Sequence, residues 1–94
     1  MTRTVQQIEH DLESLLAAGE PSTEGGILAS YRQALANAQR EGRLWAELYS
    51  VLPHGTPEWA QLAVMQALER ADDKRRQARG RIREEERLTA VTGV

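Results

Sequence analysis

The chain has 94 residues, no cysteine, two histidines and a formal net charge of −2 at pH 7. This length suits one domain with a modest core, and the lack of cysteine excludes disulfides and thiolate metal sites. No apolar run approaches the roughly 18 residues that a membrane-spanning helix requires, and residues 1–10 lack the layout of a secretory signal. We therefore expect a cytoplasmic protein.

The first predicted element is an amphipathic helix over about residues 5–18. Its apolar side chains recur at helical spacing: Val5, Ile8, Leu12 and Leu15. Thr4 followed by Gln7 is typical of a capping box, and Gly19 suits the left-handed residue that ends many helices. An isolated helix of this length is marginal in water, so we expect it to pack on the rest of the chain.

A glycine-rich connector leads to a second helix over about residues 24–52, around which the chain is organised. Its main apolar seam alternates gaps of three and four residues, as in a coiled coil: Leu28, Tyr31, Leu35, Ala38, Gly42, Trp45, Tyr49 and Leu52. A second apolar edge lies beside the seam: Ile27, Ala34, Leu44 and Leu48. Two edges on one helix predict two helical neighbours. Gly42 is either a local weakness of about 1 kcal/mol or a point of close approach by another helix.

The segment 53–57 (PHGTP) ends the second helix and starts a third, predicted over about residues 57–88, with residues 89–94 frayed. A connection this short predicts an antiparallel hairpin. The third helix is apolar nearly all round as far as Ala71 and mostly charged beyond it. It carries one faint seam: Val64, Leu68, Ala71, Arg75, Ala78 and Ile82. Being longer than the second helix, it should extend past it.

The predicted fold is therefore all-α, with residues 1–94 forming a single helical domain. It consists of a long antiparallel helical hairpin with a short N-terminal helix packed on it, which makes three helices in total. No internal repeat indicates a solenoid.

A run of basic residues on the third helix has two interpretations. It comprises Lys74, Arg75, Arg76, Arg79, Arg81 and Arg83. The run could contact phosphate or an acidic partner. Alternatively, it is a solvated face with internal ion pairs: Asp72–Arg76, Arg81–Glu85 and Arg83–Glu86. The second interpretation is favoured, because three glutamates follow the run and no aromatic side chain lies near it to stack on bases.

No pattern in the sequence indicates catalysis, a cofactor or a metal. The chain has no cysteine nucleophile and no glycine-rich phosphate loop, and its serines lie at no suggestive spacing from a histidine. His10 lies among acidic residues, but the position three before it is Gln7 rather than the glutamate that a metal site in a helical bundle would use. We expect no enzymatic activity and no catalytic, cofactor-binding or metal-ligating residue.

The layout resembles that of the small type III secretion co-chaperones of the YscE and SsaE kind. The matching stretches are residues 8–16, 27–52 and 57–78, whereas the charged extension after Ala71 and the proline-flanked turn depart from the family pattern. The resemblance implies a hairpin that pairs with a helical-repeat chaperone, so that the two together keep a needle subunit soluble.

We expect a non-enzymatic protein–protein interaction module, namely a small adaptor, co-chaperone or assembly factor. It would bind a helical partner through an exposed apolar helix face: Leu44, Leu48, Trp59, Leu62 and Met65. One alternative is a nucleic-acid-associated accessory protein of phage or plasmid type that uses residues 74–83. Another is a self-assembling helical structural protein whose seams pair between chains. The expected partners are thus a helical protein or a second copy, with nucleic acid less favoured and no membrane.

Overall fold

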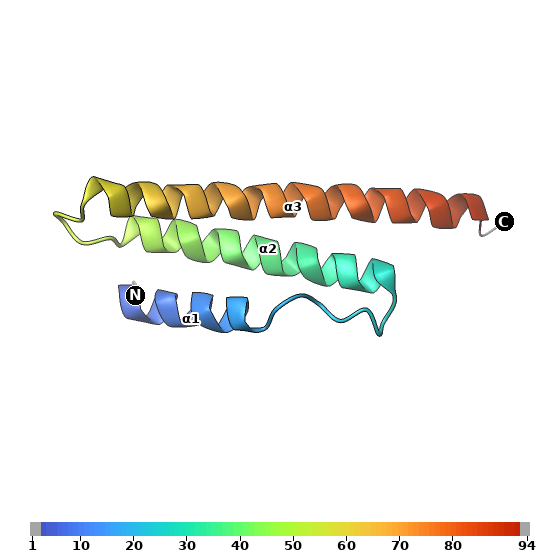
Figure 1. Ribbon diagram of the computed structural model, residues 1–94, viewed down its shortest axis with the longest axis horizontal. Helices are drawn as coiled ribbons and strands as arrows, with labels where there is room; N and C mark the ends of the chain where they lie inside the picture. The colour runs from blue at the N-terminus through green and yellow to red at the C-terminus, as the bar shows by residue number, and fades with distance from the viewer. Residues whose placement is uncertain (1–2, 93–94) are drawn as a thin grey trace.

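The computed structural model describes residues 3–92, which form three α-helices and no strand. Helix α1 spans Val5–Ala17, α2 spans Ile27–Ser50 and α3 spans Glu58–Thr92. In Figure 1, α2 lies in the middle, with α3 along one side of it and α1 along the other. Contacts join α2 to α3 and α1 to α2. The predicted hairpin with a short helix packed on it is therefore confirmed.

Helix α1 begins and ends as its sequence predicts. The Thr4 hydroxyl accepts a hydrogen bond from the Gln7 N–H at 3.2 Å, and the Gln7 side chain accepts one from the Thr4 N–H at 2.9 Å. Gly19, just beyond the helix, has a φ of 71°, which costs glycine nothing sterically. These local features set the length of α1, and burial of Ile8 and Leu12 holds it against α2.

Helix α2 is slightly shorter at both ends than the predicted range of 24–52. It starts at Ile27 because Gly26 has a φ of 97°, outside the helical region. It ends at Ser50, since Val51 leaves the helical conformation with a φ of −110°.

One hydrophobic cluster joins all three helices near the turn of the hairpin. Its buried members are Ile8 and Leu12 of α1, Leu44 and Leu48 of α2, and Val64 of α3. Figure 1 shows α1 running along the C-terminal half of α2, where these residues lie. The two neighbours predicted for α2 are thus α1 and α3.

Further from the turn, α2 and α3 meet through small side chains. The buried residues there are Ala38 on α2 and Ala67, Ala71 and Ala78 on α3. The faint seam predicted for α3 follows this interface, with Leu68, Arg75 and Ile82 half-buried. A Cβ added at Gly42 would lie 3.9 Å from the Ala71 Cβ, which is an ordinary contact. The approach of α3 therefore does not require glycine at this position.

Polar contacts connect α3 to the middle and the N-terminal half of α2. Glu41 is 8% exposed, and its carboxylate accepts from the Lys74 ammonium at 3.3 Å. Nearer the open end, Arg32 and Glu86 form an ion pair at 3.5 Å. The Arg81 guanidinium lies 5.8 Å from the centre of the Tyr31 ring, within reach of a cation–π interaction. These contacts link α2 to the charged half of α3, in which Ile82 is the only large apolar residue before Leu88.

Arg3 connects the beginning of α1 to α2. Its guanidinium donates to the Glu47 carboxylate at 2.5 and 3.1 Å and also to Asp11. The hydrogen bonds from Arg3 lower the pKa of Glu47 from its ordinary value, and the two carboxylates raise the pKa of Arg3. The ion pair therefore favours the charged forms of both partners.

Helix α3 continues further than the predicted range of 57–88. Residues 89–92, predicted to be frayed, are helical, while residues 93–94 lie outside the described residues. No glycine or proline interrupts residues 81–92, so the backbone can continue its helical hydrogen bonding. The last turns of α3 extend past the start of α2, as expected from the lengths of the helices (Figure 1).

Gly42→Ala is expected to raise the free energy of unfolding by about 1 kcal/mol, because alanine is the better helix former and the new methyl group fits. In a domain of this size, this gain corresponds to a rise of roughly 4–8 °C in the thermal midpoint measured by circular dichroism. Gly80→Ala is the matched control, since no described atom lies within 4 Å of its added Cβ. A decrease in the midpoint for Gly42→Ala alone would contradict the spacing between α2 and α3.

Glu47→Gln should remove a pH-dependent part of the stability. The pKa of Glu47 is lowered from 4.5 in the folded state, so its ion pair stabilises the fold above that pH. The stabilisation is lost as the pH falls through the lower pKa of the folded state. We therefore expect a lower thermal midpoint for the variant at neutral pH and convergence with the unchanged chain in acid. Glu13→Gln, at an exposed position on α1, is the control and should show no such convergence.

Candidate interaction surface

The structure divides the five predicted partner-binding residues between the core and the surface. Leu44 and Leu48 are 5% and 4% exposed and belong to the hydrophobic cluster. The prediction that they form part of an exposed face is therefore wrong. The physical reason is that α1 covers this edge of α2, so the edge contributes to the domain's own core.

The other three residues form an exposed apolar patch at the start of α3. Trp59 is 75% exposed, Leu62 47% and Met65 43%. With about 100° of rotation per residue, Leu62 lies about 160° around the helix from the buried Val64. The patch, which we call the Trp59 face, therefore points away from α2. Among the described residues, contacts between helices join only α1 to α2 and α2 to α3, so no helix covers this side of α3.

Most of the basic run is engaged within the chain. Lys74 pairs with Glu41, Arg76 pairs with Asp72 and Asp73, and Arg81 lies over the ring of Tyr31. Of the three ion pairs predicted from the sequence, only Asp72–Arg76 is present among the described residues.

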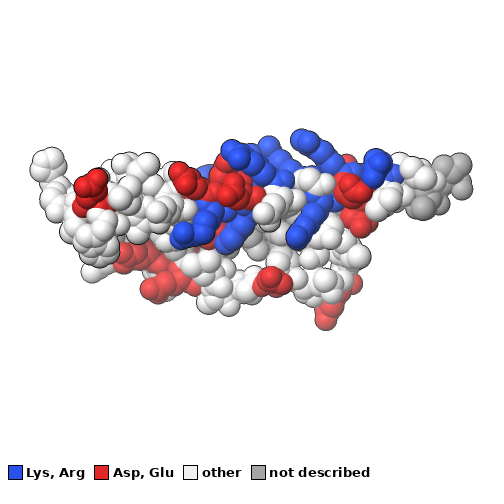
Figure 2. Space-filling model, turned by 45° about the horizontal axis from the view of Figure 1, so that its top comes forward, with Lys and Arg blue, Asp and Glu red and all other residues white. Residues whose placement is uncertain are grey.

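Arg75 is also held by Asp72. Its Nε and Nη2 atoms donate to the same carboxylate oxygen at 3.0 and 2.6 Å. These bonds lower the pKa of Asp72 from its ordinary value. The basic side chains gather from the middle of the molecule toward the C-terminal end of α3 (Figure 2). Arg79 and Arg83 are exposed and form no ion pair or ring contact with another described residue, although the charge of Arg79 helps to lower the pKa of Asp72.

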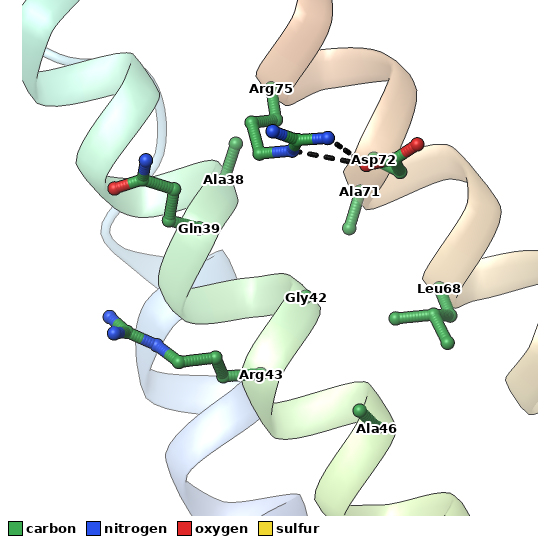
Figure 3. A pocket seen from close by; sticks show the side chains of 9 residues that line it. All are labelled: Ala38, Gln39, Gly42, Arg43, Ala46, Leu68, Ala71, Asp72 and Arg75. Atoms are coloured by element: carbon green, nitrogen blue, oxygen red, sulfur yellow. Dashed lines mark hydrogen bonds and ion pairs between the residues drawn. The ribbon is translucent and has the colours of Figure 1, made fainter.

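An open groove of about 480 Å³ lies between α2 and α3, on the side shown in Figure 3. Small or apolar side chains make up most of its floor: Ala38, Gly42 and Ala46 from α2, and Leu68 and Ala71 from α3. Gln39 and Arg43 of α2 also line the groove, as do Asp72 and Arg75 of α3, which are hydrogen-bonded to each other. The groove therefore has small or apolar side chains between two helices, with polar side chains beside them.

A second cavity, of about 520 Å³, lies under the connector between α1 and α2. It is lined by apolar residues that include Leu15, Leu16 and Tyr31, and by Lys74 and Arg81 from α3. Both cations already have partners, in the Glu41 carboxylate and the Tyr31 ring. The cavity therefore presents a mostly apolar wall in which both cations are already engaged.

The ion pair that Glu41 and Lys74 form across the hairpin was not among the pairs predicted from the sequence. Glu41 precedes Gly42 in the seam of α2, and Lys74 precedes Arg75 in the seam of α3. The signal in the sequence was that two residues of opposite charge hold the same position relative to seams that pair in antiparallel orientation. Using it would have required the alignment of α2 against α3, which the sequence does not state.

Residues 3–92 contain no group of three or more His, Asp or Glu side chains placed to hold a metal ion. In the same range, no helix combines the length and the apolar character needed to cross a membrane. The chain matches no family model, no curated protein and no solved structure.

Leu48→Ala and Leu62→Ala should differ sharply in their effects on stability. Leu48→Ala is expected to lower the free energy of unfolding by about 2–5 kcal/mol, because it leaves a cavity beneath α1. Leu62→Ala, at an exposed site, should change it by about 0.5 kcal/mol or less. Urea denaturation of both variants measures the difference. Equal effects would show that the Trp59 face is covered within the chain.

Proposed function

We propose that this protein is a non-enzymatic interaction module, such as a small adaptor, co-chaperone or assembly factor, which binds a helix of another chain through the Trp59 face. The observation that carries the proposal is the 75% exposure of Trp59 beside two further exposed apolar side chains. Contiguous apolar surface of this kind marks binding sites on many proteins. Tryptophan is also enriched among the residues that contribute most to binding.

The spacing of the Trp59 face supports a helical partner. Trp59, Leu62 and Met65 follow one another at intervals of three residues, so they form a ridge about 9 Å long on a rigid helix. Such a ridge packs into the groove of a second helix. Full burial of a large apolar side chain is worth about 1.5–3 kcal/mol, so three partly exposed ones can support specific binding.

The resemblance to small type III secretion co-chaperones is consistent with this proposal, since it implies a hairpin that pairs with a helical protein.

The alternative of nucleic-acid binding through residues 74–83 is less well supported. Lys74, Arg75, Arg76 and Arg81 already have partners within the chain, so phosphate would have to compete with them.

Leu62→Gln should abolish partner binding while leaving the fold intact, because the side chain is exposed and lies at the centre of the ridge. The full chain and the variant would be immobilised and exposed to extract of the native cell, with and without nuclease. We expect a stoichiometric helical protein to be retained by the unchanged chain in both conditions and lost with the variant.

Leu16→Gln is the matched control, since Leu16 is a leucine of similar exposure, 54%, located on α1. It should retain the partner fully. Equal retention by Leu62→Gln, or loss of all binding on nuclease treatment, would contradict the proposal. With the purified partner, Trp59 emission should shift to shorter wavelength in a Trp45→Phe background, because Trp59 is then the single tryptophan.

A further inference from the structure

Helix α3 carries two exposed apolar pairs, one at each end. Trp59 and Leu62 form the first, and Leu88 and Val91 form the second, both at a spacing of three residues. Leu88 is 46% exposed and Val91 71%. The two pairs are separated by 29 positions (59 to 88, and 62 to 91). Because 29 residues make nearly a whole number of helical turns, both pairs lie on the same face, within about 20°.

The charges between these pairs divide α3 into two halves of opposite sign. Residues 58–73 contain four acidic residues and one basic residue, whereas residues 74–92 contain seven basic and three acidic. Figure 2 shows the basic half as the part of the surface where Lys and Arg gather. A second α3 in antiparallel orientation would therefore bring acidic against basic halves, while a parallel one would bring like charges together.

The apolar pairs select the same arrangement. In an antiparallel pair of α3 helices, Trp59 of one copy can lie opposite Val91 of the other, and Leu62 opposite Leu88. In each pairing the two residue numbers sum to 150, so a single twofold axis at the level of residue 75 generates both pairings. The end of α3 that extends past α2 would then be covered by the turn end of the second copy (Figure 1).

We propose that the partner of the Trp59 face is a second copy of this chain, packed along the outer side of α3 as an antiparallel twofold dimer. This inference rests on the proposed function, since it names the helix that this face binds. It also gives Arg83 a partner. In this register, Glu69 of one copy lies opposite position 81 of the other copy. Arg83 of that other copy is therefore two residues along the helix from the point opposite Glu69. Arg83 forms no ion pair with another described residue of its own chain.

Cysteine cross-linking tests the dimer directly, because the chain contains no cysteine of its own. Gln66 and Glu84 are exposed, and their positions also add to 150. A mixture of the Gln66→Cys and Glu84→Cys full-length variants should form a disulfide-linked heterodimer under mild oxidation. Neither variant alone should form a linked homodimer efficiently. Circular dichroism would establish that both variants are folded.

Sedimentation equilibrium of the unchanged chain should show a monomer–dimer equilibrium. Trp59→Ser and Val91→Gln should each raise its dissociation constant about tenfold or more, since each removes one side of the same contact. Leu16→Gln should leave it unchanged. Efficient self-linking of Gln66→Cys would indicate a parallel dimer, and a monomer at all concentrations would show no dimer. Either result would overturn this inference.

The two proposals fail in distinguishable ways. If the chain is monomeric but Leu62→Gln still abolishes capture of another protein, only the antiparallel dimer is wrong. If Trp59→Ser changes neither the dissociation constant nor the captured protein, the Trp59 face is not a binding surface, and both proposals are overturned.

Discussion

Burial of Leu44 and Leu48 beneath α1 is the contact on which the rest of the arrangement depends. The two side chains share a cluster with Ile8 of α1 and Val64 of α3, so one core fixes the positions of three helices. Arg3 adds a polar connection between α1 and α2 at the same end of the molecule. Because α1 covers α2, the outer side of α3 is left without a helix of the described chain against it.

The open end of the hairpin is held together by different interactions. Small residues bring α2 and α3 together there, but they bury little apolar area and so contribute little hydrophobic stabilisation. Cross-helix contacts, chiefly Glu41 with Lys74 and Arg32 with Glu86, add polar links between the two helices. Exposed ion pairs are individually weak. A second chain packed along α3 would add apolar burial at the end where the isolated chain has least.

Most of the basic residues in the run on α3 make contacts within the chain. Lys74 neutralises the buried Glu41, and two arginines share Asp72. Exposed apolar pairs remain at the two ends of α3, and its two halves carry net charges of opposite sign. The proposed twofold contact would use both features, whereas phosphate would contact the basic residues alone.

Local chemistry in the sequence determined the three helices, the capping box at Thr4, the turn between the prolines and the seam of α3, because each depends on residues close together in the chain. Spacing gives the angular position of a side chain on its helix, but it does not state which neighbour covers it. Only the tertiary structure therefore decided that Leu44 and Leu48 are buried and Trp59 exposed. The pairing of Glu41 with Lys74 likewise required the alignment of two helices, which packing sets across 33 residues of sequence.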